Sequence, residues 1–270
     1  MTTANETKRS ITLSDISVTY YGRASEVRAV RNCSLSVGKG DVVGLVGESG
    51  SGKSSILMAI PRLLPVGTKV TGSVMCDGEE LTGMSERELN VRRWRRVALV
   101  PQGAMNSFTP HLSIERHITE ALEHHLGISR TAGRARAAEL MDIVDLQRGI
   151  LTRYPHELSG GQKQRAALAV ALACDPDFLL ADEPTTALDV ITQKEVLQTI
   201  TRIVRERDMG LLLVTHDLPL AAGVCDTLLV MKDGCMVESG PAGDVAANPK
   251  HPYTKTLIEA IRYMETESSS

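Results

Sequence analysis

The stretch that most constrains this chain lies at residues 47–54, which read Gly-Glu-Ser-Gly-Ser-Gly-Lys-Ser. It fits the pattern G-x-x-x-x-G-K-S/T of a phosphate-binding loop. Its glycines allow the tight turns that point successive backbone N–H groups at an anionic phosphate. Lys53 can contact the β- and γ-phosphates of a nucleotide, and the hydroxyl of Ser54 can hold Mg²⁺.

The sequence on either side supports the same prediction. Residues 41–46 are an apolar run of strand length, and residues 55–60 begin like a helix. A strand, a glycine-rich loop and a helix in this order place bound phosphates at a helix N-terminus. A chance glycine- and serine-rich loop would lack this context. The residues expected to bind nucleotide here are Gly47, Glu48, Ser49, Gly50, Ser51, Gly52, Lys53, Ser54 and Ser55.

The composition indicates a globular protein that needs no disulfide or metal framework. The chain has 270 residues, 42% of them hydrophobic, which is enough for one large domain or two small ones. Its net charge of −3 gives no global basic field for nucleic acid. The five cysteines are scattered, without a C-x-x-C pair, as expected of thiols in a reducing cytoplasm. The sequence has neither a signal peptide nor an apolar run near the ~18 residues of a membrane span, so we expect membrane contact only through another protein.

The order of apolar segments predicts an α/β fold with a helical insert. Strands are expected at 11–20, 27–37, 41–46, 71–76, 97–100, 178–181, 211–215 and 227–231. Helices are expected at 114–125, 132–146 and 162–174, within an insert that covers about 103–175. We expect residues 1–10 to be a disordered lead-in and 265–270 a frayed tail.

Polar residues follow three of the apolar strands and are candidates for chemistry. Asp182 and Glu183 follow the strand at 178–181, where Asp182 can hold Mg²⁺ and Glu183 can polarise an attacking water. Alone, this acidic pair could equally begin a surface turn. His216 follows the strand at 211–215 and can donate a hydrogen bond to a γ-phosphate oxygen. Gln102 follows the strand at 97–100, and its amide oxygen can reach Mg²⁺ or the water.

A second anion-binding surface is suggested at residues 158–162, which read Leu-Ser-Gly-Gly-Gln. Ser159 offers a hydroxyl, and the two glycines offer free backbone N–H groups, at the start of a helix. In isolation an ordinary serine N-cap would explain the same residues.

Taken together, these motifs resemble the nucleotide-binding subunits of ABC transporters, in the same order and spacing from Ile11 to about Gly240. The resemblance implies a P-loop NTPase (RecA-like) core with an N-terminal antiparallel β subdomain and an inserted α-helical subdomain. It makes 47–54 the Walker A loop and 178–182 Walker B. Gln102 becomes the Q-loop residue, Glu183 the catalytic carboxylate and His216 the switch histidine. The metal ligands implied are Ser54, Gln102 and Asp182.

The resemblance also implies a head-to-tail dimer in which each ATP binds between Walker A of one subunit and the signature motif of the other. The signature residues Ser159, Gly160, Gly161 and Gln162, and Asp189 of the D-loop at 187–189, would then serve the partner's nucleotide. Tyr20 looks like the aromatic residue that stacks on adenine, although Tyr21 could take that place.

Several stretches are similar to the oligopeptide/dipeptide/nickel importers. They are residues 47–54, 101–106, 182–190 and 248–256. The resemblance implies an ATPase domain over 11–240 and a short C-terminal extension over 241–270. It implies ATP and Mg²⁺ as ligands. No iron–sulfur cluster is inferred, because the clustered cysteines of some members are missing beyond Cys235.

The partners implied are a second ABC ATPase subunit, often a different chain, two membrane permease subunits and an extracytoplasmic substrate-binding protein. The chain would work at the cytoplasmic face of the cell membrane. The alternatives are a soluble ABC ATPase acting on nucleic acid or ribosomes, and an export ATPase. The basic run at 92–96 could be a nucleic-acid patch, but the acidic net charge favours a solvated basic helix end.

Overall fold

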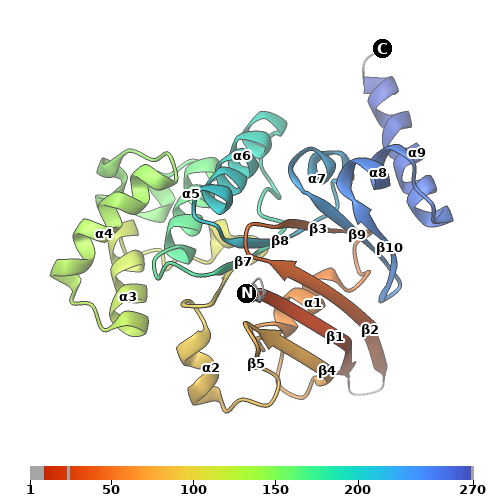
Figure 1. The fold of residues 1–270 in the computed structure, drawn as a ribbon. Coiled ribbons are helices and arrows are strands. Elements are labelled where there is room, and N and C mark those ends of the chain that lie inside the picture. Colours follow the sequence, from red (N-terminus) through yellow and green to blue (C-terminus); the bar gives the residue numbers. More distant parts are fainter. Residues whose placement is uncertain (1–8, 23–24, 269–270) are drawn as a thin grey trace, which may run out of the picture.

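The computed structural model describes residues 9–22 and 25–268. Its strands form two separate sheets (Figure 1). One sheet is antiparallel, with strand order β2-β1-β4-β5, and the other has the order β10-β9-β3-β8-β7-β6. The strands are β1 (Ser10–Tyr21), β2 (Glu26–Gly38), β3 (Val42–Val46), β4 (Lys69–Cys76), β5 (Glu79–Glu80), β6 (Val97–Val100), β7 (Phe178–Asp182), β8 (Gly210–Thr215), β9 (Thr227–Lys232) and β10 (Cys235–Pro241).

Helices cover the six-stranded sheet and fill the connections between its strands (Figure 1). The α-helices are α1 (Lys53–Ala59), α2 (Glu86–Arg92), α3 (Ile114–Leu126), α4 (Arg130–Ile143), α5 (Gly160–Ala171), α6 (Val190–Glu206), α7 (Leu218–Val224), α8 (Ala242–Ala247) and α9 (Pro252–Ser268). The 3-10 turns are η1 (Ala104–Asn106), η2 (Arg148–Thr152) and η3 (Pro155–Glu157). No helix among the described residues is both long and apolar enough to cross a bilayer.

The parallel part of the six-stranded sheet brings the ends of the buried strands together. Strands β9, β3, β8, β7 and β6 run parallel, and β10 runs antiparallel to β9. Every residue of β3, β7 and β8 is buried, which explains their unbroken apolar sequences. Val46 lies opposite Thr215, and Asp182 opposite Val214, so the residues that follow these strands share one edge.

Two hydrophobic clusters pack against the opposite faces of this sheet. Alternate residues of β3 and β8 point to each face. One cluster joins Val42 and Leu211 to the helical insert, α6 and α7. The other joins Val43 and Leu212 to α1 and the antiparallel sheet. The α/β core with an antiparallel β subdomain and an inserted helical subdomain therefore agrees with the predicted fold class.

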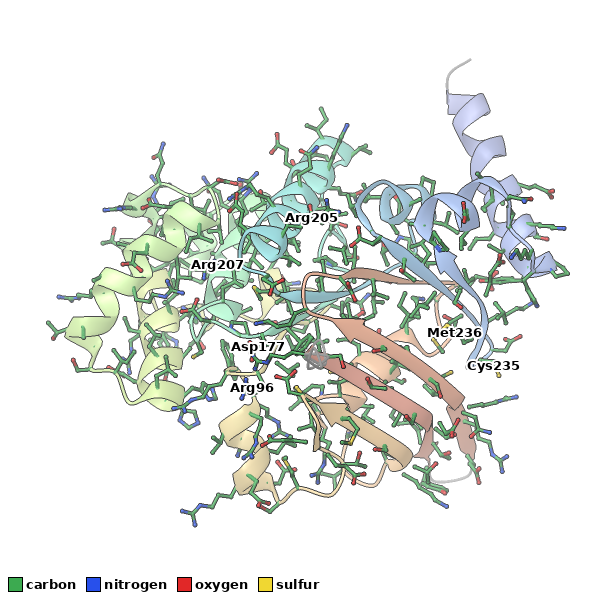
Figure 2. All side chains as sticks on the ribbon, viewed as in Figure 1. Arg96, Asp177, Arg205, Arg207, Cys235 and Met236 are labelled. Atoms are coloured by element: carbon green, nitrogen blue, oxygen red, sulfur yellow. The ribbon has the colours of Figure 1, made fainter. Side chains whose placement is uncertain are left out.

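An ion-pair cluster around Asp177 ties the two sheets together. Its carboxylate, just before β7, binds Arg9 before β1, Lys39 after β2 and Arg96 before β6, at 2.8, 3.0 and 2.7 Å. Figure 2 labels Arg96 and Asp177 side by side near the start of β1. Burial alone would raise the pKa of Asp177, but Arg96, Lys39 and Arg9 outweigh it and hold that pKa below its usual value.

The helical insert follows its predicted position, with shifts at the helix ends that side-chain caps explain. The helix predicted at 132–146 begins earlier, at Arg130, because the hydroxyl of Ser129 accepts a hydrogen bond from Ala132 N. The helix predicted at 162–174 begins at Gly160 for the same reason, with Ser159 as its cap. Among the described residues, no strand lies between β6 and β7.

Three expectations need correction. The predicted frayed tail at 265–270 is wrong as far as Ser268, because α9 continues to that residue. Of the predicted lead-in, residues 1–8 lie outside the described part, while Ser10 already begins β1. The basic run at 92–96 is not simply solvated: Arg93 pairs with Glu86 at 2.9 Å, and Arg96 belongs to the Asp177 cluster.

Candidate functional site

The phosphate loop lies between β3 and α1 and packs closely against the backbone of other segments. A Cβ atom at Gly47 would lie 2.2 Å from the carbonyl oxygen of Met231, and one at Gly52 would lie 2.2 Å from that of Ala29. Both positions also have a positive φ, of 151° and 104°. Only glycine fits either position, so these two residues of the motif are explained by close backbone approach as well as by turn geometry.

Lys53 is buried beneath the loop, although it carries an amine. Its Nζ donates to the carbonyl oxygens of Gly47 and Glu48, at 2.8 and 2.7 Å, and lies 3.3 Å from the Ser51 hydroxyl. Burial lowers the pKa of Lys53, while the nearby carboxylates of Glu183 and Asp182 oppose that shift. The amine is therefore positioned on the loop without a direct carboxylate partner, which leaves its charge available to an anionic ligand.

Ser54 in the first turn of α1 and Asp182 at the end of β7 bring two oxygen ligands together. The hydroxyl of Ser54 donates to Oδ1 of Asp182 at 3.1 Å. Asp182 is almost fully buried, and burial raises its pKa, partly offset by the Ser54 hydrogen bond. A hydroxyl and a buried carboxylate are hard oxygen ligands that suit Mg²⁺, and a cation here would compensate the cost of burying the charge.

Glu183 has three side-chain partners from three different segments. Its Oε2 accepts from Gln102 Nε2 at 3.0 Å and from the Thr186 hydroxyl at 2.9 Å, and its Oε1 lies 3.2 Å from His216 Nδ1. Burial alone would raise its pKa, but His216 and Thr186 outweigh burial and lower it. The carboxylate is therefore ionised at neutral pH and can accept a proton.

The backbone at Glu183 is also unusual. Its φ is 44°, a left-handed value that non-glycine residues rarely adopt, and Ala187 four residues later has a φ of 67°. Glu183 N donates to Val214 O at 2.9 Å, which fixes the strained residue to the end of β8. Such strain is often found at functional sites, where the surrounding structure holds it in place.

The structure separates the two tyrosines considered for adenine stacking. The hydroxyl of Tyr20 hydrogen-bonds to that of Ser55 at 2.9 Å, and its ring packs against the cluster under the antiparallel sheet. Tyr21 is 56% exposed. Tyr20 therefore lies next to the phosphate loop and is partly buried, whereas Tyr21 lines the opposite face of β1 with Ser17 and Thr19.

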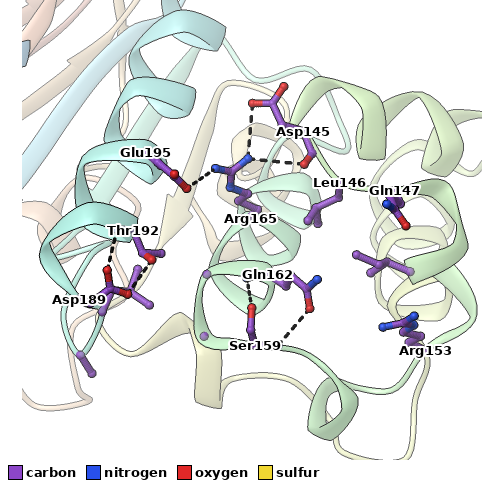
Figure 3. Close-up of a pocket in the computed structure, with 15 residues that line it drawn as sticks. Asp145, Leu146, Gln147, Arg153, Ser159, Gln162, Arg165, Asp189, Thr192 and Glu195 are labelled. Carbon is purple, nitrogen blue, oxygen red and sulfur yellow. Dashed lines mark hydrogen bonds and ion pairs between the residues drawn. The ribbon is translucent and has the colours of Figure 1, made fainter.

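The signature residues line a separate groove of about 600 Å³ (Figure 3). Ser159 caps α5, and Gln162 completes the capping box: Ser159 Oγ accepts from Gln162 N at 3.3 Å, and Ser159 N donates to Gln162 Oε1 at 3.1 Å. Asp189 caps α6 in the same way through Thr192 N, at 3.0 Å. The groove is lined by residues 145–147, Ile150, Arg153, residues 159–162, Arg165, residues 187–189, Thr192 and Glu195.

Close packing joins this groove to the carboxylate site. A Cβ at Gly160 would lie 3.0 Å from Leu188 Cδ2, and one at Gly161 would lie 2.8 Å from Thr192 Cγ2. The segment from Thr186 to Asp189 thus begins at the Glu183 carboxylate and ends against the signature helix. Met105, just after Gln102, also approaches Gly160, since its sulfur would lie 3.5 Å from a Cβ there.

The structure therefore sorts the predicted residues into two groups. Lys53, Ser54, Asp182, Glu183, Gln102 and His216 meet around the end of β7. Ser159–Gln162 and Asp189 line the other groove, which no phosphate-loop residue lines. Sequence reasoning missed Thr186, whose hydroxyl binds Glu183, although its position after Asp182-Glu183 was a possible signal. It also missed Tyr253, which contacts the loop from the C-terminal segment.

The described residues contain no cluster of three or more histidine, cysteine or acidic side chains that could hold a metal by themselves. Four cysteines are buried, and Cys235 of β10 is partly exposed (Figure 2). Burial raises the pKa of Cys76 and of Cys225, each to about 12, so these thiols remain protonated.

Comparisons with known proteins agree with this geometry. The ABC transporter family profile matches residues 30–186, and the profile of the oligopeptide/dipeptide transporter C-terminal region matches residues 237–269. The oligopeptide transport ATP-binding protein OppD of Salmonella typhimurium is 36% identical over 95% of this chain and 77% of its own length. The probable D,D-dipeptide transport ATP-binding protein DdpD of Escherichia coli is 38% identical over 94% of this chain and 78% of its own length.

Solved structures give the same result for the fold. The ATP-binding cassette MJ0796, in a dimeric post-hydrolysis state bound to ADP and Pi, superposes with a TM-score of 0.76 and 31% identity. The match covers 86% of this chain and 98% of the cassette. Sequence motifs, strand order and the meeting of the site residues therefore lead to one conclusion: the chain belongs to the ABC transporter family, as an ATP-binding subunit that hydrolyses ATP to drive transport.

Proposed function

We propose that this chain binds Mg-ATP at residues 47–55 and hydrolyses it with Glu183 as general base, to drive import of peptides or a similar small solute. The observation that carries the proposal is the convergence of Ser54, Asp182, Glu183, Gln102 and His216 beside the phosphate loop. These side chains come from the first turn of α1 and from the ends of β6, β7 and β8, which are far apart in the sequence.

Each residue has a role that its surroundings suit. The loop N–H groups and Lys53 bind the β- and γ-phosphates. Ser54 and Asp182 hold Mg²⁺, with Gln102 as a further ligand, and the ion supplies neutralisation of developing phosphate charge. Glu183 accepts the proton of the attacking water, and His216 donates a hydrogen bond to a γ-phosphate oxygen.

Gln102 and His216 both contact Glu183 in this structure. To contact Mg²⁺ and the γ-phosphate they must leave its oxygens, and their departure would free the carboxylate for water. Thr186 lies on the loop beside Glu183 and can keep its hydrogen bond throughout. A resting and an active arrangement of the site would therefore differ in whether Gln102 and His216 contact Glu183.

For adenine, we propose stacking on an aromatic residue at the end of β1. Tyr20, the sequence-based choice, lies beside Ser55 of the phosphate-loop region, whereas Tyr21 lines the opposite face of β1 with Ser17 and Thr19, so Tyr20 remains the candidate. Replacing Tyr20 by alanine should weaken nucleotide binding, by about 1–3 kcal/mol if its ring stacks on the base. Tyr20→Phe keeps the ring and serves as the comparison.

We propose that a second ABC ATPase subunit, often a different chain, pairs with this one head to tail. Ser159–Gln162 and Asp189 would then complete the partner's nucleotide site. Two observations support this arrangement: these residues line a groove separate from the phosphate loop, and Val190 and Ile191 beside it are 80% and 73% exposed. Exposed apolar side chains of this size are typical of interaction surfaces.

A groove of about 370 Å³ between the core and the helical insert offers a site for a permease. Most of its lining is apolar, and it includes Leu63, Trp94, Phe108 and Ala167. It lies next to Gln102, because Pro101, Ala104 and Ser107 line it as well. We propose that a short helix from each of two permease subunits docks on such a groove, which keeps the chain at the cytoplasmic face of the membrane.

The substrate class is inferred from relatives. Their names include transport of oligopeptides and D,D-dipeptides, and import of glutathione by GsiA of Pectobacterium atrosepticum, which is 38% identical over 94% of this chain and 42% of its own length. We propose peptides, or a similar small solute such as a nickel chelate, delivered by an extracytoplasmic substrate-binding protein.

Lys53→Ala in the assembled transporter tests the proposal. The variant loses the positive charge on the phosphate loop, so ATPase activity and ATP-dependent peptide uptake should both fall to background. Lys194→Ala on the exposed surface of α6 is the control and should retain both. Uptake at the wild-type rate in Lys53→Ala would contradict the assignment of the loop.

A further inference from the structure

A residue of the C-terminal segment contacts the phosphate loop directly. Tyr253 lies in the first turn of α9 and is 8% exposed. Its hydroxyl accepts a hydrogen bond of 3.0 Å from the backbone N–H of Glu48, the second residue of the phosphate loop. The two residues are 205 positions apart, so the contact depends on how the C-terminal segment docks.

The turn before α9 is fixed to the sheet by one carboxylate. Glu238 of β10 accepts from the backbone N–H groups of Lys250 and His251, at 2.7 and 3.0 Å. The ring of His251 in turn accepts from Tyr253 N at 3.2 Å through Nδ1. These hydrogen bonds connect β10 through His251 to Tyr253, and they fix the position of the tyrosine at the start of α9.

The ring of Tyr253 contacts a lysine, and its hydroxyl stays neutral. The amine of Lys232, at the end of β9, lies 4.8 Å from the ring centroid of Tyr253. Burial raises the pKa of the phenol, and the negative charges of Glu48 and Asp233 raise it further. The hydroxyl therefore stays protonated near neutral pH, with its oxygen free to accept the Glu48 N–H.

Glu48 also contacts the lysine of the phosphate-loop motif through its backbone. The carbonyl of Glu48 accepts from Lys53 Nζ at 2.7 Å, so Glu48 is held by Tyr253 at its N–H and by Lys53 at its C=O. Gly234 N donates to Ser51 O at 3.1 Å on the same loop. Both Tyr253 and the β9–β10 turn thus fix the loop conformation that receives phosphate.

We propose that Tyr253 is a positioning residue for the phosphate loop, through which docking of the C-terminal segment sets the affinity of the site for nucleotide. It acts through the Glu48 peptide group and touches no phosphate itself. The inference rests on the proposed nucleotide binding at this loop and adds to it a residue outside the ATPase motifs.

Tyr253→Phe tests the inference, because it removes the hydroxyl and keeps the ring over Lys232. The net value of one hydrogen bond predicts nucleotide binding weaker by about two- to tenfold. In the assembled transporter the KM for ATP should rise by a similar factor while kcat changes little, since Glu183 and Asp182 are untouched. Thr256→Val removes a hydroxyl from the same helix, one that bonds only locally to Pro252 O, and should leave binding unchanged.

Binding should be measured on the full chain by calorimetric titration with Mg-ADP, which separates binding from hydrolysis. Hydrogen exchange then reports on the loop directly. The Glu48 amide should exchange faster in Tyr253→Phe than in wild type without nucleotide, and a matching melting temperature would show that the fold is intact. By linkage, Mg-ADP should slow exchange of backbone amides near 250–258 in wild type, and less so in the variant.

The outcomes distinguish this inference from the proposed function. If wild type fails to bind Mg-ADP, the nucleotide assignment itself is wrong. If wild type binds but Tyr253→Phe binds equally well, with equal protection of Glu48, the role of Tyr253 is refuted while the ATPase assignment stands. Equal loss in Tyr253→Phe and Thr256→Val would also refute it, because a general loosening of α9 would then explain both.

Discussion

Glu183 combines a strained backbone with a carboxylate that already has three partners. Two of them, Gln102 and His216, are needed elsewhere during hydrolysis in our proposal, whereas Thr186 is not. In that proposal the hydroxyl of Thr186 keeps its hydrogen bond to Glu183 and stabilises the ionised form of the base. Its contribution can be tested separately from the chemistry of the other two.

Thr186→Val should shift the pH dependence of ATP hydrolysis. Loss of a hydrogen bond to the charged form raises the pKa of Glu183, so the carboxylate becomes protonated at a higher pH than in wild type. The acidic limb of the kcat–pH profile should move upward, with activity near neutral pH less affected. Thr152→Val, which removes a locally bonded hydroxyl on η2, should leave the profile in place. An unchanged acidic limb in Thr186→Val would mean that Glu183 does not determine it.

Much of the carboxylate site could be predicted residue by residue, because its members follow apolar strands. Asp182 ends a fully buried strand, and Glu183 and His216 each come directly after one. Thr186 could not be assigned in this way, since its role depends on the turn that folds back after Glu183. Tyr253 could not be assigned either, because its contact is long-range in sequence.

The choice between Tyr20 and Tyr21 shows a different limit. Simple alternation from Ile11 would place Tyr21 on the buried face of β1. The strand has register shifts between Leu13 and Val18, and Asp15 has a φ of 51°. This irregularity changes which residues face the core, so Ile16, Val18 and Tyr20 share the buried side. Alternation alone cannot reveal such a shift.

At the level of elements, the strands were easier to predict than the helix ends. The strand predicted at 97–100 is β6 with the same bounds, because Arg96 precedes it and Pro101 follows it. Only the basic end of helix α2 was predicted, at 92–96, and its start was missed, although Ser85 and Glu88 form a capping box there. Helix α9 runs into the expected tail as far as Ser268, in a stretch that includes Met and Glu, which favour helices.

The contact between α5 and α6 depends on having no side chain at Gly161. Gly161→Ala would place a methyl group 2.8 Å from Thr192 Cγ2, which must push the start of α6 away from the signature helix. We expect a loss of about 1–3 kcal/mol in the free energy of unfolding. ATPase activity of the assembled transporter should fall with it, because the segment 186–189 connects Glu183 to this contact. Both can be measured, by thermal or denaturant unfolding and by steady-state assay.

Gly149→Ala is the matched control for this prediction. Gly149 lies in the same helical insert, and a Cβ there would meet nothing within 4 Å. The control should keep both stability and activity close to wild type. If Gly161→Ala behaved in the same way, the close packing of α5 on α6 would not matter for the site.

On the scale of the whole molecule, the two groups of site residues lie in separate places. The phosphate loop and the carboxylate site are at the edge formed by β3, β7 and β8, and the signature groove is at the start of α5 (Figures 1 and 3). A single chain therefore presents two half-sites, as expected of a head-to-tail pair. The apolar groove beside Gln102 is a third surface, which in our proposal docks a membrane partner.

Crosslinking can test the permease surface. Among the described cysteines only Cys235 is not buried, so Cys235→Ser gives a background without exposed native thiols. In that background, Ser107→Cys and Asn106→Cys should form crosslinks to cysteines placed in permease cytoplasmic loops. Ser239→Cys on β10 is the comparison and should not crosslink. Crosslinks from the β10 side alone would show that the groove beside Gln102 is not the docking surface.

The central claim is that Glu183 is the base for hydrolysis at this chain's own phosphate loop, and Glu183→Gln tests it most directly. The variant keeps Lys53, Ser54 and Asp182, so Mg-ATP should still bind and should remain unhydrolysed at this site. Loss of a general base typically lowers the rate about 10²–10⁴-fold. Glu139→Gln on the exposed face of α4 is the control and should match wild type. The measurement is single-turnover hydrolysis, together with the amount of ATP retained per site. Retained ATP with turnover slowed by at least about a hundredfold is the predicted result, whereas hydrolysis at the wild-type rate would contradict the account and make His216 the leading candidate for the base.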